Sequence, residues 1–125
     1  MKKLMLIFVA IFFFLRAAPN CQQNSTSYPH SPSPTVYNVE YKVTGTANKV
    51  DIIIENKDGE TSMYSDIPIP WSYSFEREQG EFVYISAQNC GETGSVTVTI
   101  YRDGDVFRTA TSDDLWATAT VYGTL

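Results

Sequence analysis

Histidine, cysteine and basic residues are scarce in this chain, and each scarcity excludes a class of function. The 125 residues contain two cysteines and a single histidine, His30. One histidine removes most Ser-His and Cys-His catalytic arrangements, and so few sulfur and imidazole groups cannot build a tetrahedral zinc site. We therefore expect a protein that is not an enzyme and has no catalytic residue, cofactor or metal.

Basic residues are outnumbered, with 9 Lys and Arg against 14 Asp and Glu and a formal charge of −5. Lys and Arg form no cluster after the first few positions, whereas nucleic-acid binding needs a basic footprint. We expect no nucleic-acid partner. Asp103-Gly104-Asp105 lacks the further oxygen ligands of a calcium loop and is typical of a tight turn.

Only one long apolar run is present, at residues 4–15, directly after the basic segment Met1-Lys2-Lys3. Its length suits the core of a signal peptide and is short for a membrane span. The segment that follows, Ala17-Ala18-Pro19-Asn20-Cys21, is similar to the lipobox of bacterial lipoproteins, although Pro19 and Asn20 are unusual there.

These residues predict a lipoprotein signal peptide at 1–20 and lipidation of Cys21. Cleavage near Ala18 without lipidation and an uncleaved anchor are the alternatives. Several acyl chains hold a protein stably at a membrane, so we expect an extracytoplasmic protein of the cell envelope. The membrane would be the inner or outer membrane of a Gram-negative bacterium, and the leaflet stays open.

The next residues, 21–35, form a tether rich in Ser and Pro that contains His30. Its prolines favour an extended chain with a reach of roughly 40 Å. From residue 36 to 125 apolar and polar residues alternate, as in Val39-Glu40-Tyr41-Lys42-Val43, and no helical period appears. Asp58-Gly59 and Asp103-Gly104 predict hairpin turns, and the last two strands are expected in 105–111 and 115–123.

About seven to eight short strands in fewer than 90 residues predict an all-β fold, an antiparallel immunoglobulin-like β-sandwich. Trp71 is in phase with Tyr73 and Phe75 and is expected in its core. The aromatic side chains expected at the surface, where they could stack on a ligand such as a sugar, are Tyr64, Tyr101, Trp116 and Tyr122.

Cys90 lies in a loop between two predicted strands, next to the acidic Glu92. Negative charge disfavours the thiolate, so we expect a free, unreactive thiol. Pairing of Cys90 between two chains is the alternative, and a Cys21–Cys90 disulfide would require Cys21 to be free of lipid.

Three segments carry a resemblance to a known family: YKVTGTANKVDIIIENKDG at 41–59, IPIPWSYSFEREQGEFVYISAQN at 67–89 and TGSVTVTIYRDGDVFRTATS at 93–112. They resemble the soluble domain of the mycobacterial small membrane protein (MmpS) family and its lipoprotein relatives in Bacteroidetes-type bacteria. The resemblance implies an extracytoplasmic β-sandwich held at a membrane, an accessory partner of large exporters of lipids and siderophores. The mycobacterial members have a transmembrane helix where this chain has a lipoprotein-like signal.

Together these observations predict a non-enzymatic, membrane-tethered envelope lipoprotein that binds or assists another envelope component, such as an export system. The alternative is a carbohydrate- or lipid-binding surface module that acts without a transporter partner.

Overall fold

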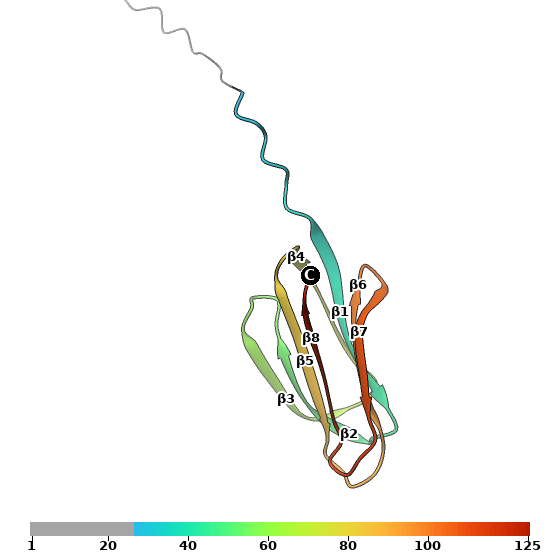
Figure 1. The fold of residues 1–125 in the computed structure, drawn as a ribbon. Coiled ribbons are helices and arrows are strands. Elements are labelled where there is room, and N and C mark those ends of the chain that lie inside the picture. Colours follow the sequence, from blue (N-terminus) through green and yellow to red (C-terminus); the bar gives the residue numbers. More distant parts are fainter. Residues whose placement is uncertain (1–26) are drawn as a thin grey trace, which may run out of the picture. The chain divides into compact units, whose positions relative to one another are not determined.

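Eight strands form where the sequence alternates apolar and polar side chains (Figure 1). The computed structural model describes residues 27–125, so the predicted signal peptide and Cys21 lie outside the described residues. Residues 27–35 have no regular secondary structure. The strands are β1 (Val36–Gly45), β2 (Lys49–Glu55), β3 (Thr61–Pro68), β4 (Trp71–Glu78), β5 (Phe82–Asn89), β6 (Val96–Arg102), β7 (Asp105–Ser112) and β8 (Thr118–Thr124).

The strands pair into two antiparallel four-stranded sheets, in the orders β4-β1-β6-β7 and β3-β2-β5-β8. The two sheets pack face to face, and the predicted all-β antiparallel sandwich is thereby confirmed. Only β2–β3 and β6–β7 are hairpins within one sheet, and every other connection leads from one sheet to the other. Among the described residues no helix is long and apolar enough to cross a membrane.

The core lies between the sheets and is filled by the inward-facing residue of each strand's alternation. β1 contributes Val39, Tyr41 and Val43, all completely or almost completely buried. Trp71, Tyr73 and Phe75 of β4 pack against this cluster, as the sequence predicts. Burial of one such large apolar side chain stabilises the fold by roughly 1.5–3 kcal/mol relative to exposure.

The two ends of the sandwich differ in what they carry. Val36, at the start of β1, pairs with Glu78 at one end, and there Thr35 O accepts a hydrogen bond from Gln79 N–H of the β4–β5 turn at 2.8 Å. The hairpin turns β2–β3 and β6–β7 and the residue Leu125 lie at this end too (Figure 1). The opposite end carries the four loops that follow β1, β3, β5 and β7.

The turns behave as predicted, but the last strand does not begin where the sequence indicated. Asp103 and Gly104 both have positive φ, at 50° and 83°, as a two-residue hairpin turn with the right twist requires. β8 begins at Thr118 and not at Leu115, because Trp116 has φ 54° and Ala117 N–H bonds back to Asp114 O at 2.8 Å. The expectation of strand from 115 is therefore wrong for residues 115–117, which belong to the β7–β8 loop.

Candidate functional site

The outer face of the β3-β2-β5-β8 sheet carries a group of large apolar and aromatic side chains. The strands place them there because alternate residues point away from the core. The group, called the aromatic face below, consists of Ile53, Met63, Phe82, Tyr84 and Tyr122. Met63 is 72% exposed, Tyr122 is 61% exposed and Phe82 is 43% exposed.

Strand pairing brings these residues together. Ile53 is opposite Met63 on β3, and Tyr84 is opposite Tyr122 on β8. The rings of Phe82 and Tyr122 lie with their centroids 6.2 Å apart. Beside Ile53 and Met63 the same face is hollowed by a depression of about 260 Å³. The arrangement offers apolar area together with the phenol groups of Tyr84 and Tyr122, which suits contact with another molecule.

The outer face of the other sheet is polar. Thr97 and Thr99 on β6 pair their hydroxyls with Thr111 and Thr109 on β7, at 2.7 and 3.0 Å. This face also includes Glu40 and Lys42 on β1 and Ser72, Ser74 and Glu76 on β4. Its apolar contribution is smaller and includes Tyr101 and the exposed Val106, which are opposite each other on β6 and β7. The two outer faces of the sandwich therefore differ in chemistry, and only one of them presents a run of exposed apolar side chains.

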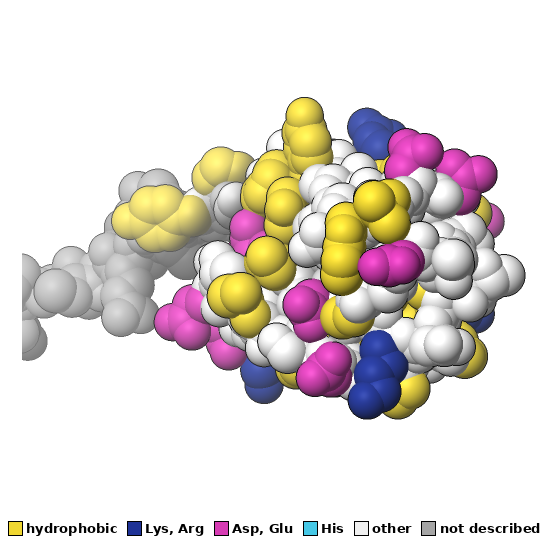
Figure 2. Space-filling view, turned by 90° about the horizontal axis from the view of Figure 1, so that it is seen from below, with side chains coloured by type: hydrophobic (Ala, Val, Ile, Leu, Met, Phe, Trp, Pro, Cys, Tyr) yellow, Lys and Arg dark blue, Asp and Glu magenta, His cyan; other side chains and the backbone are white. Residues whose placement is uncertain are grey.

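The loop end of the sandwich adds exposed apolar side chains (Figure 2). Leu115 and Trp116 lie in the β7–β8 loop, and Trp116 is 50% exposed. Seen from this end, hydrophobic side chains reach the surface with acidic side chains between them. Gln88 at the end of β5 lies beside the loop, with its Nε2 3.4 Å from the Trp116 carbonyl.

The four aromatic residues selected from the sequence occupy four different environments. Tyr122 is on the aromatic face, and Trp116 is in the β7–β8 loop at the other end of β8. Tyr101 is half-buried on the polar face of the opposite sheet. Tyr64 differs from the expectation of a surface residue, because its ring packs towards the core, 5.5 Å from the ring of Trp71. The four side chains do not form one site.

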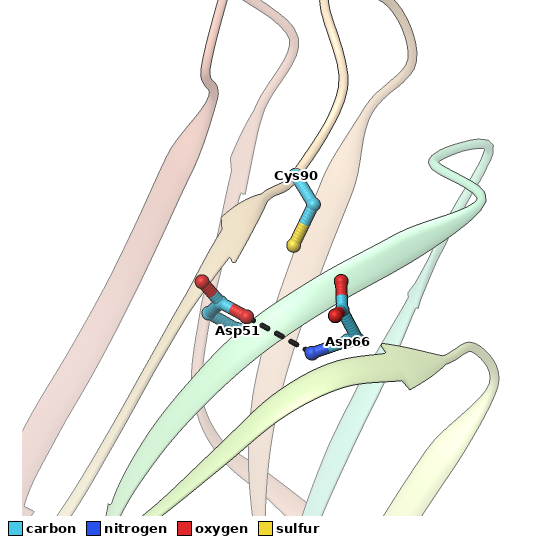
Figure 3. Close-up of side chains that lie close together, drawn as sticks. All are labelled: Asp51, Asp66 and Cys90. Atoms are coloured by element: carbon cyan, nitrogen blue, oxygen red, sulfur yellow. Dashed lines mark hydrogen bonds between the residues drawn. The ribbon is translucent and has the colours of Figure 1, made fainter.

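Cys90 lies beside two carboxylates (Figure 3). It follows β5, while Asp51 belongs to β2 and Asp66 to β3, and the side-chain donor atoms of the three lie within 4.8 Å of one another. Asp66 has φ 54° at an irregularity in the β2–β3 register, and its N–H donates to Asp51 Oδ1 at 3.0 Å. The backbone of Cys90 is tied down too, because its N–H donates to Lys49 O at 3.0 Å.

This environment keeps the Cys90 thiol protonated. Burial raises the pKa of Cys90, and the hydrogen bond to Asp51 and the negative charges of Asp51 and Asp66 raise it further. A negative charge beside Cys90 was predicted from the sequence, but from Glu92. The charges of Asp51 and Asp66 could not be predicted, because strand pairing brings these residues close and cannot be read from neighbours in the chain. Two exposed carboxylates with one protonated thiol do not by themselves make a metal site, and we assign no ion to them.

Arg77 is a buried charge that was not predicted from the sequence. It is 7% exposed, and its Nη2 bonds Glu55 Oε1 at 2.6 Å and Phe82 O at 2.9 Å, while Nη1 bonds Lys57 O at 3.3 Å. Glu81 adds an ion-pair contact at 3.5 Å. Its burial could have been predicted from the alternation, because Arg77 is in phase with Trp71, Tyr73 and Phe75 and so faces inward.

Comparison of the chain with models of known protein families finds no match, and a search of curated proteins finds none either.

Proposed function

We propose that this chain is a non-enzymatic binding module of the cell envelope, held at a membrane by lipid on Cys21. The observation that carries the proposal is the contrast between its outer faces, one aromatic and one polar. Exposed apolar area that is gathered on one side of a soluble domain marks an interaction surface more often than scattered exposed residues do. Aromatic residues and Met are also the types enriched at protein interfaces.

The end of the domain at which the tether joins supports this role. A lipid anchor at Cys21 followed by the Ser/Pro-rich residues 22–35 would join the domain where Val36 begins β1. The four loops, including Leu115 and Trp116, are at the opposite end of the sandwich. The tether would hold the domain within roughly 40 Å of the membrane and leave the aromatic face open to a neighbour.

The partner class follows from the resemblance to the MmpS family, which suggests an accessory role beside an envelope export system. The alternative is a carbohydrate- or lipid-binding module without a transporter partner. The exposed ring of Trp116 favours this alternative, because a sugar can stack on an indole ring without any conformational change in the sheet.

Site-specific photo-crosslinking tests the proposal. A photoreactive amino acid replaces Tyr122 on the aromatic face or, as the matched control, Tyr101 on the polar face of the other sheet. In native membranes the probe at position 122 should crosslink to one envelope component, and the probe at 101 should not. Equal crosslinking at both positions, or none at 122, would contradict a one-sided binding module. A crosslinked glycan or lipid in place of a protein would favour the alternative.

The anchor is tested separately by metabolic labelling with a fatty-acid analogue. We expect the wild-type chain to take the label and to sediment with membranes, and the Cys21→Ser variant to do neither. A wild-type chain that labels no better than Cys21→Ser would remove lipidation from the proposal but would leave the binding face untouched.

A further inference from the structure

The free edge of β8 differs from the other three sheet edges in that the strand itself has no feature that blocks pairing. Among the described residues, the one charged side chain known to lie against it is Arg108 of β7, which is close to Gly123 near the end of the strand. β8 is hydrogen-bonded to β5 alone, and its register with β5 is continuous from Phe82–Thr124 to Gln88–Thr118. Its seven residues, TATVYGT, contain no charge and no proline. Proteins usually protect exposed edges with charges, prolines or bulges, so an edge without them is a template for another strand.

The other edge strands each carry such protection. β3 has a register irregularity opposite Asp51, a positive φ at Asp66, and Pro68. β4 carries Glu76 and Glu78 on its solvent side, and β7 has Asp105, Arg108 and a register shift against β6. The contrast is within one molecule, and it sets β8 apart.

The backbone groups that β8 leaves free can be identified from two hydrogen bonds. Leu125 N–H donates to Glu81 O at 2.9 Å, and Ala117 O accepts from Asn89 N–H at 2.8 Å. Residues of an antiparallel pair alternate between facing the partner strand and facing away from it. The odd-numbered residues of β8 therefore bond β5, and the N–H and C=O groups that point to the open edge belong to Thr118, Thr120, Tyr122 and Thr124.

We propose that two copies of this chain pair through β8, antiparallel about a two-fold axis, and so join their β3-β2-β5-β8 sheets into one. β8 can pair with β8 of a second copy, because the residues that face the open edge come opposite one another in an antiparallel pair. With the axis near Val121, Thr120 of one copy is opposite Tyr122 of the other, and Ala119 is opposite Gly123. The pairing brings no like charges together, which would oppose it, and leaves each free edge group a partner.

The dimer would also double the aromatic face, because Tyr122 lies on the outer side of the strand that pairs. This inference does not depend on the proposed function. A probe at Tyr122 that crosslinks to a second copy of the chain reports pairing through β8, whereas a crosslink to another envelope component reports the partner, so either proposal can fail alone.

Cysteine scanning of the full chain in membranes tests the pairing. Single cysteines replace Thr118, Thr120, Tyr122 or Thr124 in a Cys90→Ser background, and the parent background measures any disulfide through Cys21. We expect disulfide-linked dimers that are strongest near the middle of β8. Controls at the exposed Thr61 and Ser65 on the β3 edge should stay at the background level. Equal linkage at β3 and β8, or none at β8, would overturn the proposal.

A pair of variants at one position tests the backbone contact itself. Thr120→Pro removes an N–H that faces the open edge and that the β5–β8 ladder does not use, so proline should be tolerated there. Thr120→Val keeps the N–H and loses only the hydroxyl bond to Ser86 Oγ at 2.8 Å. In detergent at 0.15 M salt, which screens the net charge, light scattering should give a dimer for wild type and Thr120→Val.

Thr120→Pro should give a monomer with an unchanged circular dichroism spectrum. Two other results would overturn the proposal: a monomeric wild type, and a Thr120→Val variant that is as monomeric as Thr120→Pro. If Thr120→Pro unfolds, the cysteine scan still decides.

Discussion

At the residue scale, Cys90 illustrates how strand pairing sets the reactivity of a side chain. Its pKa is raised first by burial and then by Asp51 and Asp66. The thiolate is the reactive form, so near pH 8 alkylation by iodoacetamide should be slower than that of free cysteine.

Variants of the acidic neighbours provide the test of this reactivity. Asp51→Asn should increase the alkylation rate several-fold, because it removes one negative charge beside the sulfur. Glu92→Gln is the matched control and should leave the rate unchanged, since Glu92 does not contribute to the raised pKa. A faster reaction in Glu92→Gln than in Asp51→Asn would contradict the geometry of the cluster.

Tyr41 makes the stability of the domain depend on alkaline pH. Its ring is fully buried, its hydroxyl donates to Glu55 O at 2.9 Å, and it accepts a bond from Tyr84 N–H at 3.2 Å. Burial raises the pKa of Tyr41 above its ordinary value of 10.0. A folded-state pKa above the unfolded one means that this contribution is complete below pH 10 and is lost as the pH rises further.

Urea unfolding as a function of pH tests this contribution. The free energy of unfolding of the wild type should be flat around neutral pH and fall above pH 10. Tyr41→Phe should be less stable at neutral pH by about 1–3 kcal/mol, because it leaves buried backbone groups without their partner. It should also lose part of the alkaline decline. An identical decline in both proteins would exclude Tyr41 as its source.

At the element scale, the positions of strands and turns could be predicted because they depend on neighbours in the chain. Alternation located β1 and β2, and Asp58-Gly59 and Asp103-Gly104 located the two hairpins, each with a glycine of positive φ. The start of β8 could not be predicted, because Leu115 and Trp116 look like strand residues. Only the backbone, with a positive φ at Trp116 and the bond from Ala117 N–H to Asp114 O, shows that they turn the chain.

The β5–β6 loop depends on one side chain, Asn89. It is almost fully buried, its Nδ2 donates to Thr93 O at 2.7 Å, and its Oδ1 accepts from Gly91 N–H at 2.8 Å. Asn89→Ala should lower the free energy of unfolding by about 1–3 kcal/mol, because it leaves these loop groups unsatisfied.

Chemical denaturation measures the loss, and hydrogen exchange at Gly91 should become faster in Asn89→Ala. Asn89→Asp should fall between the wild type and the alanine variant, because a carboxylate can still accept from Gly91 but cannot donate to Thr93. An alanine variant as stable as the wild type would show that the loop keeps its conformation without Asn89.

At the scale of the whole molecule, Arg77 connects the two sheets. It lies on β4, while Glu55 is on β2 and Phe82 on β5 of the opposite sheet. Breaking a buried ion pair on one side typically costs about 3–5 kcal/mol. We expect Arg77→Ala to lower the free energy of unfolding, measured in urea, by about that amount. Glu55→Gln keeps an acceptor for Nη2 and should lower it by less. A loss below that of Glu55→Gln would contradict this role.

The pairing of strands was beyond the reach of the sequence, and with it the membership of the aromatic face. β1 pairs with β4 and β6, so Val39 lies between Phe75 and Arg102, residues far along the chain. Tyr122 was identified as a surface aromatic, but Ile53, Met63, Phe82 and Tyr84 were not. Their assembly on one face depends on the register between strands, and alternation alone does not specify which strands are neighbours.

The crossings between sheets bear on how the chain acquires its structure. Five of the seven connections lead from one sheet to the other, and neither sheet is complete until a late strand, β7 or β8, has joined it. Such non-local topology slows folding to the order of milliseconds to seconds. Until then the early strands present unpaired hydrophobic edges, and chaperones that bind extended segments would have time to act on the chain.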